Sequence, residues 1–107
     1  MEQPKAFVVE LNEKPEYQRL MQSPATLGLK AGRVYLEPGK ECGVHSTEDR
    51  EELLVFLAGR GQAIIGRGNL AVGQGKVCYI PPRTEHNIIN TGDEPLVYVF
   101  CVVPVCR

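Results

Sequence analysis

Short runs of apolar residues recur along this chain of 107 residues, separated by glycine, proline and small polar residues. Such runs are typical of β-strands, whose side chains alternate between two faces, and the separators are typical of turns. The runs cover residues 6–11, 53–58, 62–65, 70–72, 77–80 and 96–103, and a further strand begins at His86. No convincing long amphipathic helix is present, so the pattern predicts an all-β jelly roll or barrel.

The first third of the chain is less regular. Residues 6–11 suit an edge strand that could be exchanged with a partner subunit. Residues 14–22 mix apolar and polar side chains and fit either a helical turn or an irregular loop. Strand material between residues 27 and 36 is interrupted by Gly28, Ala31 and Gly32, which predicts a broken strand.

Residues 39–61 read as two strands joined by a polar turn. His45 and Thr47 lie two residues apart, so in an extended segment their side chains share a face. The turn at residues 48–51 reverses the chain, and Glu52 begins the next strand. Alternation places Glu52 on the same face as Phe56 and places Glu51 outward.

A second stretch complements the first. His86 follows a turn at Pro81 and Pro82, for which two trans bonds are expected. The chain contains only two histidines, His45 and His86. If both point inward with Glu52, they form a two-histidine, one-carboxylate set, which suits a divalent transition metal.

The spacing of these residues resembles the two motifs of the cupin family. The first family motif reads glycine, five residues, His-x-His, three or four residues, glutamate, six residues, glycine, and it is kept by Gly39, His45, Glu52 and Gly59. The second reads glycine, five residues, Pro-x-Gly, two residues, histidine, three residues, asparagine, and it is matched by Gly75, Pro81, His86 and Asn90. The resemblance implies a single domain, residues 1–107, with the cupin-type double-stranded β-helix or jelly-roll barrel.

Two positions depart from the family pattern. Thr47 stands in place of the second histidine, so only His45, Glu52 and His86 carry over as metal ligands. A threonine hydroxyl is at best a weak ligand or a hydrogen-bond partner of a bound water. Arg83 stands in place of a glycine, which is harmless if that turn position does not need a positive φ. Thr47, Arg83 and Phe56 are candidates to line the site, and the alternative for Arg83 is a solvated rim at the barrel mouth.

The resemblance leaves two kinds of function open. One is a metal-dependent enzyme, dioxygenase-like or isomerase-like, that holds Fe, Mn, Ni, Zn or Co and a small oxygenated organic molecule in the barrel. The other is a non-enzymatic cupin that binds or senses a small molecule, with or without metal. Fold and ligand set do not select between them.

The composition limits the classes of partner that this protein is expected to bind. The net charge is −1 and no basic patch is present, which argues against nucleic acid. The first eleven residues lack the basic start and long apolar core of a secretory signal, and no apolar run approaches the ~20 residues that cross a bilayer. We therefore predict a cytoplasmic protein without a membrane partner. Similarity to small barrels that pair through edge strands and an apolar outer sheet predicts a homodimer.

The four cysteines form no Cys-x-x-Cys pair and are expected to be free thiols packed as small apolar residues. They are Cys42, Cys78, Cys101 and Cys106. Cys42 precedes His45 by an odd number of residues, so on a regular strand it would face away from the site.

Overall fold

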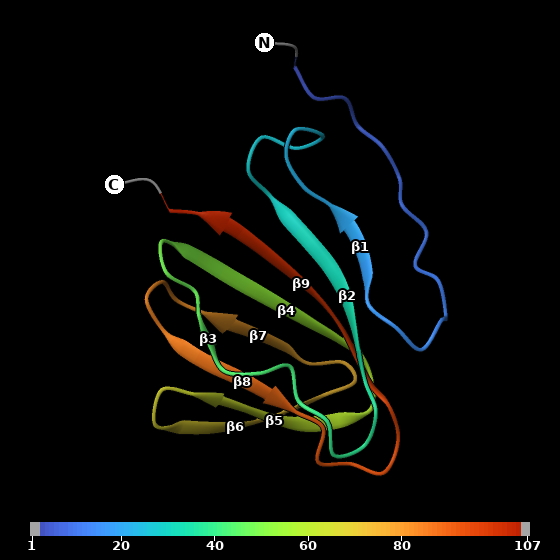
Figure 1. The fold of residues 1–107 in the computed structure, drawn as a ribbon, viewed down its shortest axis with the longest axis vertical. Coiled ribbons are helices and arrows are strands. Elements are labelled where there is room, and N and C mark those ends of the chain that lie inside the picture. The colour runs from blue at the N-terminus through green and yellow to red at the C-terminus, as the bar shows by residue number, and fades with distance from the viewer. Residues whose placement is uncertain (1–2, 106–107) are drawn as a thin grey trace.

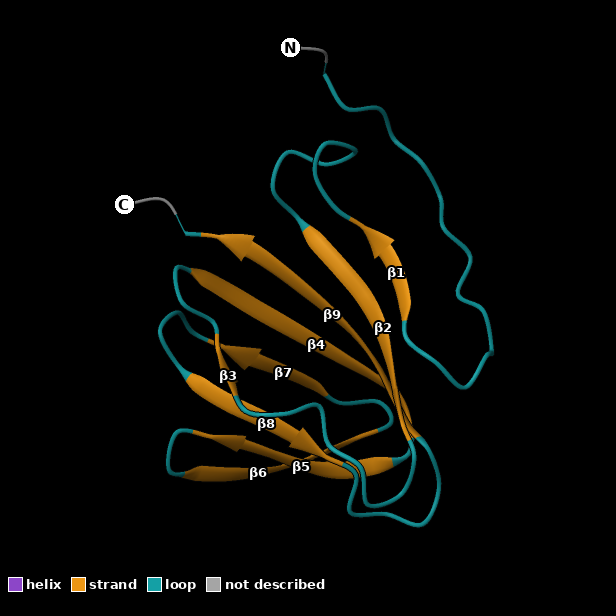
Figure 2. Ribbon diagram, in the orientation of Figure 1, coloured by secondary structure: helices purple, strands orange, loops and turns teal. Residues whose placement is uncertain are grey.

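The computed structural model describes residues 3–105, which contain nine β-strands and no helix (Figures 1 and 2). In chain order the strands are β1 (Gln18–Met21), β2 (Lys30–Leu36), β3 (His45–Ser46), β4 (Arg50–Ala58), β5 (Arg60–Ile65), β6 (Gly68–Gly73), β7 (Val77–Ile80), β8 (Glu85–Ile89) and β9 (Leu96–Pro104). No segment within residues 3–105 is a helix of the length and apolarity that a membrane crossing needs.

The strands form two antiparallel sheets. One has the order β1-β2-β9-β4-β7 and the other has the order β3-β8-β5-β6. The chain crosses repeatedly between them, so that sequence neighbours such as β3 and β4 lie in different sheets (Figure 1). This arrangement confirms the predicted all-β jelly-roll barrel of the double-stranded β-helix type.

The core lies between the sheets and follows the predicted alternation. On β4 the inward positions Glu52, Leu54 and Phe56 are buried, while the outward Leu53 and Leu57 stay 40% and 38% exposed. The remaining core comes from both sheets: Leu36, Ala63, Val72, Cys78, Ile80, Ile88, Leu96 and Tyr98. Because Glu52 shares a face with these residues, the fold directs its carboxylate into the barrel.

The motif residues outside the ligand set hold the ends of strands. Gly59 has a φ of +80°, and a Cβ there would lie 2.9 Å from the Cα of Leu96, so another residue would collide with the chain that opens β9. The Asn90 side chain donates hydrogen bonds to the carbonyls of Leu36 and Glu94 at 2.9 and 2.8 Å. These two residues therefore shape the closed end of the barrel.

The N-terminal third differs from expectation. Residues 6–11 form no strand and run along the outside, where Val8 is 92% exposed. The first strand is instead β1, within the segment for which a helical turn or a loop was expected. β2 is also continuous through Ala31 and Gly32, because all seven of its residues pair with β9. Long-range pairing overrides the local breaking tendency of glycine here.

A buried arginine attaches this N-terminal segment to the sheet. Arg33 lies on β2 and is only 3% exposed. Its Nη2 donates to Asn12 Oδ1 at 2.6 Å and to the carbonyls of Lys14 and Glu16, and its Nε donates to Gln18 Oε1 at 3.3 Å. The guanidinium thus holds residues 12–18 against the outer side of the barrel.

Candidate metal centre

The two histidines reach the cavity from one pair of strands. His45 on β3 and His86 on β8 are direct partners in the antiparallel register, so their side chains leave the same face. Their ring centroids lie 4.1 Å apart with an interplanar angle of 63°. The pairing of β3 with β8 therefore positions two of the three predicted ligands.

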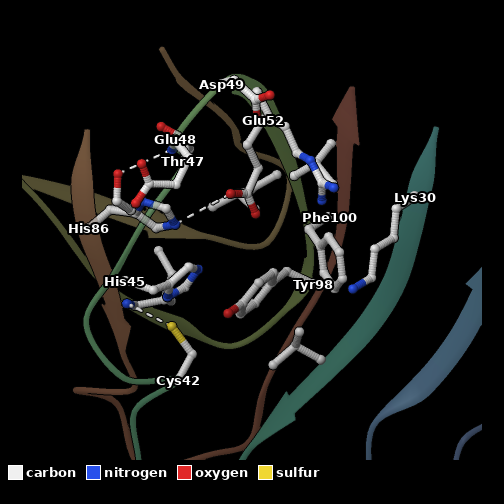
Figure 3. Close-up of a pocket in the computed structure, with 16 residues that line it drawn as sticks. Lys30, Cys42, His45, Thr47, Glu48, Asp49, Glu52, His86, Tyr98 and Phe100 are labelled. Carbon is white, nitrogen blue, oxygen red and sulfur yellow. Dashed lines mark hydrogen bonds and ion pairs between the residues drawn. The ribbon is translucent and has the colours of Figure 1, made fainter. Parts of the chain in front are cut away.

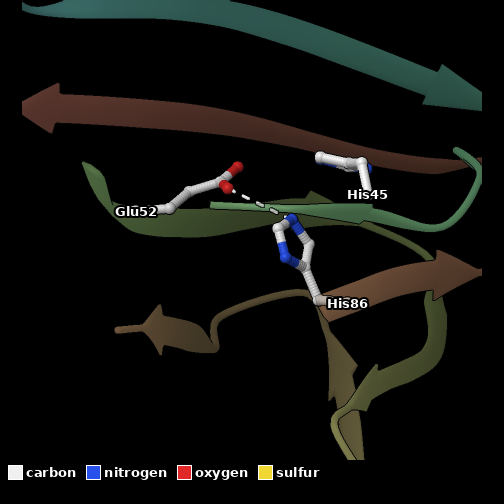
Figure 4. Close-up of side chains that lie close together, drawn as sticks. All are labelled: His45, Glu52 and His86. Carbon is white, nitrogen blue, oxygen red and sulfur yellow. Dashed lines mark ion pairs between the residues drawn. The ribbon is translucent and has the colours of Figure 1, made fainter. Parts of the chain in front are cut away.

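Glu52 faces the histidines from the opposite sheet (Figure 4). Its Oε1 lies 3.3 Å from His86 Nε2. One ligand atom from each of His45, Glu52 and His86 can be chosen so that all three lie within 4.8 Å of one another. The structure thus brings together the three residues that the motif spacing singled out, and the distances suit ligands arranged around one ion.

Backbone carbonyls set the orientation of both rings. Nδ1 of His45 lies 2.9 Å from the carbonyl oxygen of Gly43, and Nδ1 of His86 lies 3.0 Å from that of Thr84. A carbonyl only accepts, so each Nδ1 carries the proton and each Nε2 keeps its lone pair. This is the arrangement in which a histidine binds a metal through Nε2.

His86 Nε2 is a buried nitrogen without a hydrogen-bond partner among residues 3–105. The Glu52 carboxylate lies 3.3 Å away, within ion-pair distance. Buried polar atoms are normally paired, because leaving one unpaired costs about 1–3 kcal/mol. A cation between Nε2 and the carboxylate would satisfy both groups, so the donor set fits a divalent metal.

The electrostatics of His86 and Glu52 also favour a cation between the two side chains. Burial lowers the pKa of His86, but the Glu52 carboxylate and the Thr84 carbonyl raise it by more, so the net pKa is above the ordinary 6.5. The position between the ring and the carboxylate therefore attracts positive charge, which can be a proton or a metal ion.

Thr47 lines the cavity, but its hydroxyl is engaged elsewhere. It donates to the carbonyl of Pro81 at 2.6 Å and accepts from the amide of Thr84 at 3.1 Å. The side chain is 6% exposed. Thr47 therefore fixes the loop that precedes His86, and the contact of its remaining lone pair with a metal or a bound water stays a prediction.

Two residues expected at the site lie outside it. Arg83 is exposed and has a φ of 51°, so the condition under which arginine would be harmless in this turn is not met. Its amide donates to the carbonyl of Glu48 at 2.8 Å, which ties the turn down while the side chain stays outside the cavity. Phe56 does not line the cavity either, because it is 2% exposed and packs against Tyr98 in the core. The bonds before Pro81 and Pro82 are trans, as expected.

The site opens into a cavity of about 360 Å³ (Figure 3). Its wall is largely apolar and comes from Val34, Leu54, Ile88, Tyr98, Phe100 and Val102. Charged residues that also line it are Lys30, Glu48, Asp49 and Arg50. A pocket of this size with an apolar wall and a few convergent polar groups suits a small organic ligand.

Cys42 also lines the cavity, although alternation predicted that it would face away. The prediction is wrong because Gly43 has a φ of 98°, which breaks the regular strand before His45. Burial raises the pKa of the Cys42 thiol and also that of the Tyr98 hydroxyl. Both groups are thus neutral near pH 7. Cys78 and Cys101 are free thiols, as expected, and Cys106 lies outside the described residues.

Comparison with known proteins identifies the barrel. The family model described as "Cupin domain" matches residues 32–103, a range that contains all three residues of the cluster. The chain belongs to the cupin family. The match runs from within β2 to within β9, so the cupin region includes strands of both sheets but not β1.

Relatives of this cupin carry different names. An uncharacterised protein of Methanocaldococcus jannaschii is 35% identical over 66 residues, which are 62% of this chain and 53% of the relative. A glucose-6-phosphate isomerase of Pyrococcus abyssi is 37% identical over 60 residues, which are 51% of this chain and 32% of the isomerase. An oxalate-binding protein of Thermotoga maritima is 28% identical over 66% of this chain and 59% of its own. This cupin therefore spans only about half or less of the length of the first two relatives.

Solved structures support the fold. A protein of Bacillus halodurans superposes with a TM-score of 0.83 at 22% identity, over 97% of this chain and 85% of the other. A predicted oxalate decarboxylase of Thermotoga maritima gives a TM-score of 0.79 at 24% identity, over 83% and 79% of the two chains. At these identities the likeness concerns the fold alone.

Proposed function

We propose that this cupin binds one divalent transition-metal ion through His45, Glu52 and His86, and that the ion and the cavity together hold a small oxygenated organic molecule. Iron, manganese, nickel, zinc and cobalt all suit two imidazoles and one carboxylate. The observation that carries the proposal is the buried His86 Nε2, which has no hydrogen-bond partner among residues 3–105 and lies 3.3 Å from Oε1 of Glu52.

Each part of the site has a definite role in this proposal. A bound ion supplies Lewis acidity and open positions at which ligand oxygens can be polarised. The carbonyls of Gly43 and Thr84 hold the two rings with Nε2 toward the cavity. Thr47 fixes the loop before His86, and the apolar wall formed by Leu54, Tyr98 and their neighbours limits water around the ligand.

Elemental analysis of the untagged protein tests metal binding. Wild type should carry about one transition-metal ion per chain, and Glu52→Gln should carry none, because the amide removes the anionic ligand. Glu51→Gln is the matched control: its carboxylate accepts from the Tyr79 hydroxyl at 2.8 Å, away from the cavity. A wild type without stoichiometric metal, or a Glu52→Gln variant that retains it, would contradict the proposal.

The metal-bound protein has two candidate functions, which are catalysis on a small molecule and binding of a small molecule without turnover. The similarity to glucose-6-phosphate isomerases supports an isomerase-like enzyme, whereas the similarity to an oxalate-binding protein supports binding without turnover. Oxygen uptake and product formation, measured with candidate acids and sugar phosphates, divide the two. Turnover that disappears in Glu52→Gln indicates an enzyme, and ligand binding without any product indicates a binding protein.

A homodimer and a cytoplasmic location are also proposed. The outward faces of β4 and β7 expose Leu53, Leu57, Val77 and Tyr79, and the extended residues 6–11 are exposed beside the barrel. A second copy could cover these apolar surfaces. Light scattering at micromolar concentration should give a dimer mass, and cell fractionation tests the location. The proposal includes no nucleic-acid or membrane partner.

A further inference from the structure

One cation of the cavity has no use in the proposed metal centre. Lys30 begins β2 and lines the cavity, and its ammonium pairs with no carboxylate among residues 3–105. Figure 3 shows Lys30 on the opposite side of the pocket from His86, with Tyr98 and Phe100 between them. An unpaired cation that faces a ligand cavity can attract an anionic group of the ligand.

The register of the larger sheet places Lys30 relative to the metal ligands. Lys30 is the partner of Val102, and Val102 is also the partner of Glu52. The three residues thus form one row across β2, β9 and β4, and their side chains share the inner face. With about 4.8 Å between neighbouring strands, the Cα atoms of Lys30 and Glu52 lie about 10 Å apart.

The surface between these two ends is apolar. Val102 separates Lys30 from Glu52 within the row, and Phe100 and Leu54 form the next row on the same face. All three line the cavity. A ligand that spans the cavity therefore meets the metal ligands at one end, hydrocarbon in the middle and an ammonium at the other end.

The geometry points to a short dicarboxylic acid as the ligand, with an oxygen-chelating head at the metal and a second carboxylate at Lys30. This inference rests on the proposed metal centre and makes Lys30 the residue that determines specificity. The charges of the cavity match a dicarboxylate. A divalent ion together with Glu52 leaves one positive charge where the chelating head would bind, and Lys30 supplies a second where the tail carboxylate would bind. A dianion matches both, whereas a monoanion leaves the ammonium without a partner.

Arg50 is the alternative cation in the same cavity. It lies two residues before Glu52 on β4 and follows Glu48 and Asp49, which also line the cavity. Those two carboxylates give the segment formed by residues 48–50 a net charge of −1. We therefore assign the tail carboxylate to Lys30, whose row neighbour Val102 is apolar.

Calorimetry with a matched pair of acids tests the assignment. 2-Hydroxyglutarate and 2-hydroxypentanoate have the same head and the same number of carbons, and only the first has a tail carboxylate. Zinc-loaded wild type should bind the dicarboxylate about tenfold more tightly, which corresponds to about 1.4 kcal/mol. Lys30→Met should remove this preference and leave the affinity for 2-hydroxypentanoate within about twofold, and Lys30→Arg should retain it.

Three controls show whether a change in affinity comes from Lys30, from another cation or from loss of the metal. Lys76→Met, which removes an exposed lysine before β7, should change neither affinity. A loss of the preference in Arg50→Met but not in Lys30→Met would overturn the assignment, as would a wild type that binds both acids equally. Metal content, measured on the same samples, separates failure of the metal centre from failure of the ligand assignment. If the protein holds metal but binds neither acid, only the proposed ligand class is refuted. If the protein holds no metal, the metal centre and the ligand assignment that rests on it are both refuted.

Discussion

Among residues 3–105, the buried arginine, glutamate and histidine side chains lie in two places, and the two places are built differently. Arg33 and His86 are each 3% exposed. The guanidinium of Arg33 donates four hydrogen bonds to neutral oxygens of residues 12–18. Nε2 of His86, in contrast, has no hydrogen-bond partner among residues 3–105 and lies within ion-pair distance of the Glu52 carboxylate.

The difference separates structural burial from functional burial. At Arg33 the protein supplies the hydrogen-bond partners itself, so the group stabilises the attachment of the N-terminal segment without any ligand. At His86 the protein orients the ring through Thr84 and leaves the other nitrogen open. A buried site that the chain leaves incomplete is completed by something from outside, and the donors there select a cation.

Removal of the Arg33 guanidinium should give the largest effect. Arg33→Met removes the donor to the carbonyls of Lys14 and Glu16 and one of the two donors to each of the Asn12 and Gln18 side chains, so the free energy of unfolding should fall by about 3 kcal/mol. Urea denaturation measures the change. Arg19→Met, at an exposed position of β1, should change it by less than about 0.5 kcal/mol. If the two variants were equally stable, the buried hydrogen bonds of Arg33 would not stabilise the fold.

Metal should stabilise the protein only through the incomplete site. At a free metal concentration about one hundred times the dissociation constant, binding to the folded state adds about 2.7 kcal/mol to the free energy of unfolding. Thermal or urea unfolding with and without zinc should show this gain in wild type and Glu51→Gln. Glu52→Gln should show no such gain with zinc. An equal gain in that variant would mean that the ion binds at a site that does not include Glu52.

Thr47 offers a smaller and sharper test. Thr47→Val keeps the shape but leaves the Pro81 carbonyl and the Thr84 amide without their hydroxyl partner, which should cost about 1.5 kcal/mol. Metal content should stay at the wild-type level, because the hydroxyl uses its proton and one lone pair on the loop before His86. Thr47→Ser should recover most of the stability. If Thr47 were instead a ligand, the valine variant would lose metal affinity and keep its stability.

The sequence predicted the parts of the fold and the cluster that depend on local pattern. The alternation of Glu52, Leu54 and Phe56 placed the carboxylate inward, and the motif spacing brought His45 and His86 to it. These inferences succeeded because strand periodicity and family spacing both describe neighbours along the chain.

The parts that the sequence did not predict depend on distant neighbours or on single backbone angles. Lys30 enters the cavity because β9 lies between β2 and β4, a sheet order that no local pattern contains. Cys42 turns inward because of the φ of Gly43. Residues 6–11 have the composition of a strand, but pairing needs a free edge, and none within residues 3–105 receives them.

The brevity of β3 has a kinetic consequence for this centre. Only His45 and Ser46 form the strand, and backbone hydrogen bonds from Cys42 and Thr47 to β8 and its preceding loop extend the pairing on either side. Fraying of so short a segment requires far less free energy than unfolding of the whole barrel. An ion held by His45 can therefore exchange with solution while both sheets stay intact, and its exchange rate reports the opening of β3 rather than the stability of the protein.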